Sequence, residues 1–148
     1  MISFDTNILV YAATESTDER HMRAVTLTAQ AVRSRRCVQT LQSLAEFYNV
    51  TTRRAGIRHD SAAAIVAGWQ RFVPVEAATI ADLEHAMRAV RDYQLSFWDA
   101  LLWATVRRIG ISVLVSEDFQ DGRVIEGVRI ANPFAPANAA VIEAALRL

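Results

Sequence analysis

Short β-rich segments alternate with long, alanine-rich helical segments along the whole chain. We expect strands near residues 2–5, 36–39, 73–76, 112–116 and 128–131. The spacing of apolar residues predicts helices near residues 7–14, 19–34, 41–54, 60–72, 79–93, 97–109 and 137–147. Strands that alternate with helices form a parallel sheet with helices on both faces. The sequence therefore predicts an α/β fold, a three-layer α/β/α sandwich with a central, mostly parallel sheet of about five strands.

No internal repeat or Pro/Gly-rich linker divides the chain, which indicates a single domain over residues 1–148. No apolar run approaches the roughly 20 residues that span a bilayer, so we expect no membrane segment. Asp5 and Asn7 interrupt the apolar run that a secretory signal needs, which predicts a cytoplasmic protein. The lone Cys37 agrees, since one thiol cannot build a disulfide framework or a Cys-rich zinc site.

The cationic side chains are 16 arginines, and the chain has no lysine. Without lysine, neither a Walker A phosphate loop nor Schiff-base chemistry is available. A phosphatase of the haloacid-dehalogenase type is disfavoured too, because that family uses a lysine and has an Asp where this chain has Asn7. Arginine itself suits phosphate, because its planar guanidinium donates bidentately. Since the net charge is 0, an RNA-binding surface must be local, from pairs such as Arg35–Arg36, Arg53–Arg54 and Arg107–Arg108.

Two acidic residues follow predicted strands. Asp5 comes directly after the apolar run Ile2–Phe4, and Asp118 follows the strand near 112–116. In open parallel sheets ligands gather beyond the carboxyl ends of the strands, so we expect these two carboxylates at one edge. Asp121 precedes a glycine and is most simply part of a turn. Glu117 and Asp121 nevertheless remain possible substitutes for Asp118.

Two more carboxylates lie on predicted helices. Glu46 shares the polar face of the third helix with Arg53, and in isolation it would be an ordinary surface residue. Asp99 lies in the first turn of the sixth helix among apolar neighbours, where an unpaired carboxylate would be costly. Asp99 either interacts favourably with the helix macrodipole behind an N-cap at Ser96, or ligates a metal ion that offsets its burial. Both alternatives stay open.

Ligands made only of oxygen select Mg²⁺ or Mn²⁺ rather than Zn²⁺. Three histidines have no paired spacing, and we expect surface or capping roles for His21, His59 and His85. Three tryptophans lie in amphipathic helices, and we expect core or subunit packing rather than base stacking for Trp69, Trp98 and Trp103. Four carboxylates around one divalent cation indicate metal-dependent phosphodiester chemistry.

Four short motifs occur in an order and spacing that resemble the PIN-domain ribonucleases: Asp5-Thr6-Asn7, Glu46, Trp98-Asp99-Ala100 and Ser116-Glu117-Asp118. They look most like the VapC toxins of type II toxin–antitoxin systems. The resemblance runs from residue 1 to about residue 134, and leaves residues 137–148 as a C-terminal helical tail. It implies a PIN-like sandwich, an Mg²⁺-dependent endoribonuclease in which Mn²⁺ can substitute, a homodimer, and a cognate antitoxin that neutralises the protein.

The resemblance also assigns roles to residues. The family's acidic positions are matched by Asp5, Glu46, Asp99 and, at the more variable fourth position, Asp118. Of these, the implied metal ligands are Asp5, Asp99 and Asp118. The polar residues that orient ligands or water are matched by Thr6, Asn7 and Ser116. The last motif departs from the family pattern, since acidic residues stand at 117, 118 and 121, and this leaves the fourth carboxylate open.

The expected reaction is hydrolysis of an RNA phosphodiester bond by a metal-activated water, with the carboxylates placing the metal and the water. Two alternatives remain: a PIN-like binding module with little or no catalysis, and a metal-dependent nuclease that acts on DNA. If an antitoxin exists, we expect one of its segments to lie in a groove near Glu46 and Asp99.

Overall fold

The computed structural model describes residues 1–147. Its helices are α1 (Thr6–Ala13), α2 (Glu19–Ser34), α3 (Leu41–Arg53), α4 (His59–Phe72), α5 (Ile80–Tyr93), α6 (Phe97–Arg108), the short 3₁₀ helix η1 (Pro136–Asn138) and α7 (Ala139–Leu146). Its strands are β1 (Ile2–Phe4), β2 (Gln39–Thr40), β3 (Val75–Glu76), β4 (Val113–Val115), β5 (Val124–Ile125) and β6 (Val128–Ala131). Every α-helix begins and ends within two residues of its predicted range.

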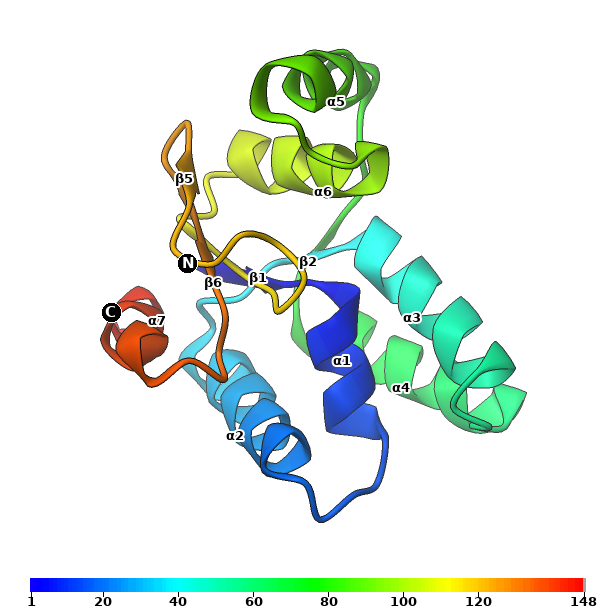
Figure 1. Cartoon of the computed structure of the whole chain (residues 1–148). Helices are drawn as coiled ribbons and strands as arrows, with labels where there is room; N and C mark the ends of the chain where they lie inside the picture. The colour runs from blue at the N-terminus through cyan, green and yellow to red at the C-terminus, as the bar shows by residue number, and fades with distance from the viewer. Residues whose placement is uncertain (148) are drawn as a thin grey trace.

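A four-stranded sheet lies at the centre in the order β1-β4-β6-β5, and β2 and β3 form a separate parallel pair beside it (Figure 1). β1, β4 and β6 are parallel, and β5 runs antiparallel to β6. A bridge from Ile2 to Cys37 joins β1 to the segment before β2. The mostly parallel sheet is therefore confirmed, although its predicted strands are divided between two sheets.

The strand β5 was not predicted. It is only two residues long and returns to β6 through Glu126 and Gly127, which have φ angles of 45° and 87°. Positive φ at both loop positions is the geometry of a tight type I′ hairpin turn. The glutamate at the first position hides this signal, since Asn or Asp would be usual there.

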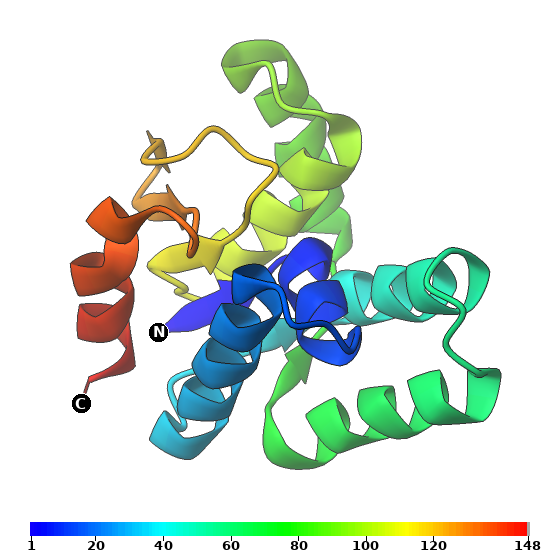
Figure 2. The ribbon, with the colours of Figure 1, turned by 60° about the horizontal axis from the view of Figure 1, so that its bottom comes forward.

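Helices cover both faces of the sheet. Side chains of β4 alternate between two buried apolar clusters: Val113 and Val115 pack with β1, α1, α2 and α7, whereas Leu114 packs with α5 and α6. This alternation follows from the two-residue period of a strand. Figures 1 and 2 show α5 and α6 on one side of the sheet and α1 and α2 on the other. The predicted α/β/α layering is confirmed.

The C-terminal tail is packed onto the domain. Ile142 of α7 is fully buried in the same cluster as β1, and Asn138 of η1 is 7% exposed. The tail thus completes the apolar layer over one face of the sheet. Cys37 is buried, and burial raises the pKa of its thiol to about 12. No helix within residues 1–147 has the length and apolar character needed to cross a membrane.

An almost fully buried carboxylate joins α5 to α6. Asp82 accepts hydrogen bonds from the backbone and hydroxyl of Thr79 and from Arg108 Nε, at 2.8–2.9 Å for the shortest contacts. Burial raises the pKa of Asp82, but the bonds from Thr79 and Arg108 outweigh it and leave the pKa below its ordinary value. The ionised form is therefore the one that the fold stabilises.

We expect Asp82→Ala to lower the free energy of unfolding by about 3 kcal/mol at pH 7, because it leaves Arg108 without its buried partner. Since the pKa is lowered in the folded state, this stabilisation exists at neutral pH and fades as acid titrates the folded carboxylate. Urea unfolding at pH 7 and pH 3 measures both effects, with the exposed Asp92→Ala as a control. Equal stability of the two variants would contradict this role for Asp82.

Candidate active site

Asp5 lies where β1 ends and α1 begins. Its backbone is extended, its N–H donates to Val115 O of β4 at 2.9 Å, and it is the N-cap of α1. The side chain is 9% exposed; Oδ1 accepts from Thr6 N at 2.7 Å and Oδ2 accepts from Ser116 Oγ at 2.6 Å. The first predicted ligand is therefore held rigidly at the carboxyl edge of the sheet.

The electrostatics of Asp5 differ from those of an ordinary carboxylate. The pKa of Asp5 is raised from 3.8 to about 6, mainly by burial and to a smaller extent by the negative charges of Asp99 and Glu46, while hydrogen bonds from Ser116 and Thr6 oppose the shift. The folded protein thus disfavours negative charge at this point. A bound cation would relieve that cost.

Asn7 connects Asp5 to the loop after β4. Its Nδ2 lies 3.3 Å from Asp5 Oδ2, 3.3 Å from Ser116 Oγ and 3.0 Å from Asp118 Oδ2. Ser116 Oγ also accepts from the N–H of Asp118 at 3.2 Å. The amide oxygen Oδ1 of Asn7 is buried and has no hydrogen-bond partner among residues 1–147. One unused oxygen therefore accompanies the two carboxylates.

Glu46 reaches the same region from α3. Thr6 Oγ1 donates to its Oε2 at 3.2 Å, and Gln42 Nε2 donates to its Oε1 at 2.9 Å. The Gln42 amide also donates to the carbonyl of Trp98 at 3.0 Å, which ties α3 to the start of α6. Glu46 is thus a positioned carboxylate rather than a freely solvated one.

Asp99 lies in the first turn of α6, where the capping alternative is confirmed and the metal-ligand alternative stays a prediction. Ser96 caps α6 and accepts from Asp99 N at 3.2 Å, so the capping interpretation is correct. The carboxylate itself lines the same pocket as Asp5 and is half-buried there. It accepts no hydrogen bond from any residue in the range 1–147. Its charge therefore remains available to a ligand in the pocket.

One pocket of about 440 Å³ collects the predicted acidic residues, and it is lined by Asp5, Thr6, Asn7, Val10, Tyr11, Glu46, Val50, Asp99, Glu117 and Asp118. The donors are oxygen atoms, which is the ligand chemistry of Mg²⁺ and Mn²⁺. As the side chains stand, no three His, Cys, Asp or Glu groups within residues 1–147 are arranged to hold a metal ion. The oxygen donors fit such a cation. To bind the cation, the more exposed carboxylates would have to move toward Asp5.

The family follows from comparison with known proteins. Residues 2–124 match the PIN domain. The chain belongs to the PIN domain family. This agrees with the resemblance found in the acidic motifs. No curated protein matches the chain significantly.

Solved structures share this PIN fold. VapC20 of Mycobacterium tuberculosis, described as a toxin that cleaves the sarcin–ricin loop, is 26% identical over 77% of this chain and 87% of its own, with a TM-score of 0.63. A toxin–antitoxin complex from Klebsiella pneumoniae (18% identity, 90% and 98% coverage, TM-score 0.65) is similar in fold. So is FitAcB from Neisseria gonorrhoeae (13%, 90% and 99%, TM-score 0.59). The structural neighbours of this PIN domain thus include a toxin and a toxin–antitoxin complex.

The three acidic candidates after β4 differ in their surroundings. Glu117 is paired with Arg20 Nη1 at 2.6 Å and accepts from Tyr11 OH at 2.7 Å. Asp121 lies outside the pocket lining and accepts from Asn132 N and Asn138 Nδ2, where it supports the start of the tail. Within residues 1–147, Asp118 alone of the three shares the Asn7 donor with Asp5. The geometry of this PIN domain therefore favours Asp118 over Glu117 and Asp121 as the fourth carboxylate of the site.

Several neighbours of the site were not anticipated. Tyr11 lines the pocket and was overlooked, although it lies four residues after Asn7 on the same face of α1. Arg20 stacks over Tyr11 at 5.7 Å, a contact that the sequence spacing does not reveal. Core or subunit packing was expected for Trp98; it is 62% exposed, so it is not in the core of this chain, and subunit packing stays a prediction. Arg53 is exposed at the end of α3 and does not line the pocket.

Proposed function

We propose that this PIN-domain protein is a divalent-metal-dependent endoribonuclease and the toxin of a toxin–antitoxin pair. The observation that carries the proposal is the convergence of Asp5, Glu46, Asp99 and Asp118 on one pocket at the carboxyl edge of the sheet. Membership of the PIN family supports nuclease chemistry. The similarity to an RNA-cleaving toxin at 26% identity supports RNA as the substrate.

In this proposal Asp5, Asp99 and Asp118 hold Mg²⁺, for which Mn²⁺ can substitute. When bound, the cation supplies positive charge for the scissile phosphate and lowers the pKa of water. Asp5 provides the fixed ligand because β1, Thr6 and Ser116 immobilise it. Asp118 is exposed and provides the adaptable ligand.

The remaining polar residues position these groups. Asn7 and Ser116 orient the Asp5 carboxylate, and such supporting contacts are worth about 10- to 100-fold in metal affinity or activity. Thr6 holds Glu46 Oε2 at the pocket wall, where this oxygen can accept a hydrogen bond from water. No covalent enzyme intermediate is needed, because water is the nucleophile.

The partner would bind beside the acidic pocket. A mostly apolar groove shares Glu46 with that pocket and is lined by Leu41, Gln42, Ala45, Glu46, Asn49, Ala77, Ala78, Trp98 and Leu101. An antitoxin helix could lay its apolar face in this groove and direct an arginine to the carboxylates. We also propose a homodimer, which is supported by exposed large apolar side chains such as Ile80 and Met87.

The test is cleavage of structured RNA and of single-stranded DNA, each with Mg²⁺ or Mn²⁺ and with EDTA. The proposal predicts metal-dependent cleavage of RNA in preference to DNA. Preferential cleavage of DNA would instead support the DNA nuclease. A normal antitoxin complex without any cleavage or metal binding would support the binding module.

A paired comparison identifies the fourth carboxylate. We expect Asp118→Asn to lower RNA cleavage by about 10-fold or more, because it removes a charge that faces Asp5 across Asn7. Glu117→Gln should change cleavage by less than about 3-fold, because Arg20 and Tyr11 already engage that side chain. Initial rates at saturating Mg²⁺ are the measurement. The opposite ranking would assign the role to Glu117.

A further inference from the structure

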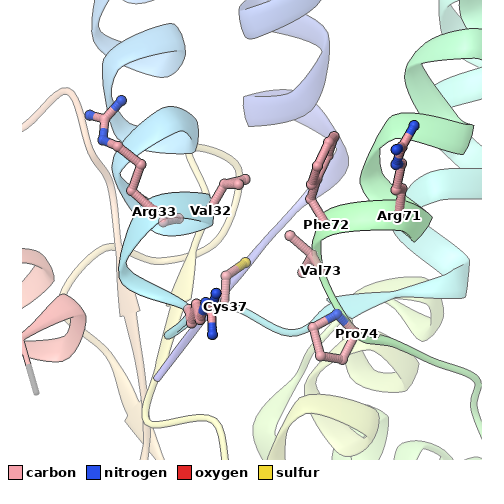
Figure 3. Close-up of a pocket in the computed structure, with 9 residues that line it drawn as sticks. Val32, Arg33, Cys37, Arg71, Phe72, Val73 and Pro74 are labelled. Carbon is pink, nitrogen blue, oxygen red and sulfur yellow. The ribbon is translucent and has the colours of Figure 1, made fainter.

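A second pocket, of about 560 Å³, lies at the opposite edge of the sheet. It is lined by Ala31, Val32, Arg33, Arg35, Cys37, Arg71, Phe72, Val73 and Pro74, and we call it the arginine pocket. Cys37 pairs with Ile2, the first residue of β1, whereas Asp5 follows the last residue of that strand. The arginine pocket therefore lies beyond the amino end of β1, away from the acidic site. Figure 3 shows it between the ends of α2 and α4, with Cys37 in between.

The arginines of this pocket have no acidic partner in its lining. Within residues 1–147, no acidic residue lines the pocket, although Arg33 also lines a neighbouring cavity that contains Glu143. Arg33, Arg35 and Arg71 are exposed, and within residues 1–147 none of their guanidinium groups forms an ion pair or a hydrogen bond. Arg20 and Arg108, in contrast, are both paired with carboxylates.

Helix electrostatics explain only part of this arrangement. Arg33 and Arg71 occupy the last turns of α2 and α4, where a cation favours the helix macrodipole. That effect acts on each helix separately. It does not explain why three arginines border one cavity. In Figure 3, Arg33 and Arg71 lie on opposite sides of this cavity and extend outward from its rim.

An aromatic side chain borders the same cavity. Phe72 is 65% exposed, and the Arg71 guanidinium carbon lies 5.6 Å from the centroid of its ring. Exposed aromatic rings next to arginines are the pattern by which proteins bind single-stranded nucleic acid, with bases stacking on the ring and phosphates on the cations. An acidic peptide would use the arginines but would leave the ring without a partner.

We propose that the arginine pocket binds single-stranded RNA, with Arg33, Arg35 and Arg71 contacting phosphates and Phe72 stacking on a base. The inference rests on the proposed function in that RNA is the substrate. RNA binding at this pocket would explain how the protein attracts its substrate, since the acidic pocket repels phosphate and the formal net charge of the chain is 0. The arginine pocket supplies the local positive charge that would attract RNA to the protein.

The test measures binding alone. A fluorescein-labelled oligouridine of about 12 nucleotides, of the order of one single-strand binding site, is titrated in EDTA by fluorescence anisotropy at several salt concentrations. We compare wild type with the triple variant Arg33→Gln/Arg35→Gln/Arg71→Gln. The matched control is Arg58→Gln/Arg88→Gln/Arg129→Gln, which removes the same charge from three exposed positions elsewhere.

The pocket variant should bind at least about 10-fold more weakly, with a log–log salt slope that is smaller by about two, since each phosphate contact contributes about 0.7. The control should stay within about 3-fold of wild type, as screened surface charges do. Equal losses in both triple variants would overturn the proposal. Circular dichroism melting verifies that all variants are folded.

Phe72→Ala separates stacking from charge. It should weaken oligouridine binding by at least about 5-fold while leaving the salt slope unchanged. Met22→Ala is the control and should have no effect, because Met22 is an equally exposed apolar side chain that does not line the arginine pocket. Unchanged binding by Phe72→Ala, or tighter binding of an oligoglutamate competitor than of unlabelled oligouridine, would overturn RNA as the ligand.

The two proposals can fail separately. Metal-dependent RNA cleavage by wild type, combined with unchanged RNA binding by the pocket variant, would contradict RNA binding at the arginine pocket but would support the endoribonuclease activity. RNA binding through the arginine pocket without any cleavage would contradict the endoribonuclease activity but would support the arginine pocket as an RNA-binding site.

Discussion

Replacing Asp5 with asparagine should stabilise the metal-free protein at pH 8 by up to about 3 kcal/mol while it removes the proposed activity. The pKa of Asp5 rises from 3.8 to about 6 on folding, chiefly through burial. A pKa that differs by one between the folded and unfolded chain corresponds to about 1.4 kcal/mol of stability. Because the folded pKa is the higher one, the stability gained from the protonated form is complete below about pH 4 and is lost as the pH rises through about 6. Asparagine keeps the neutral form at every pH.

Urea unfolding in EDTA at pH 4 and pH 8 measures this difference. The advantage of Asp5→Asn over wild type should be largest at pH 8 and small at pH 4. Asp118→Asn is the control, since it makes the same substitution at an exposed carboxylate of the same pocket. A variant that is less stable than wild type at pH 8 would show that the charge on Asp5 is already compensated in the metal-free fold.

Replacing Asp99 with asparagine should lower kcat/KM for RNA cleavage by at least about 100-fold. The reason is that a ligand to a catalytic cation contributes several kcal/mol to the transition state, and each 1.4 kcal/mol is a factor of ten. The fold should be unaffected, because the backbone N–H of residue 99 still donates to Ser96 and the carboxylate accepts no hydrogen bond within residues 1–147.

Asp92→Asn is the matched control for this loss. It removes an exposed carboxylate from the end of α5, and Asp92 does not line the acidic pocket. Its cleavage rate should equal that of wild type. Near-normal kcat/KM for Asp99→Asn, with unchanged thermal stability, would remove Asp99 from the proposed ligand set.

The helices were predictable because local signals set their ends. Thr79 and Asp82 form a capping box at α5, and Ser96 caps α6 three residues before Asp99. The strands were less predictable because pairing with neighbours defines them. The predicted strand near 36–39 became a bridge at Cys37 followed by β2, and the two-residue β5 exists only through its pairing with β6.

The site could be anticipated where topology dictates proximity. Asp5 and Ser116 follow adjacent parallel strands, so the rule for carboxyl ends of strands brings them together. The environments of Glu117 and Asp121 depend on contacts with Arg20 and Asn138, which come from distant segments. The sequence therefore could not rank the three acidic residues after β4.

The arginine pocket, too, could be predicted from the sequence only in part. Arg35 belongs to a pair that the charge pattern singled out as a possible RNA contact. Its companion Arg71 comes from the far end of another helix, 36 positions later in the chain. Only the packing of α2 and α4 beside Cys37 brings the two side chains to one cavity.

Calorimetric titration of Mg²⁺ or Mn²⁺ into wild type, Asp5→Asn and Asp99→Asn tests most directly whether the acidic pocket holds the proposed cation. This is the decisive point, since the carboxylates of the metal-free structure must close in around the ion. We predict saturable binding of the metal ion to wild type, and a dissociation constant that is higher by about 10-fold or more in both variants. Binding to either variant with the affinity and stoichiometry of wild type would contradict the account.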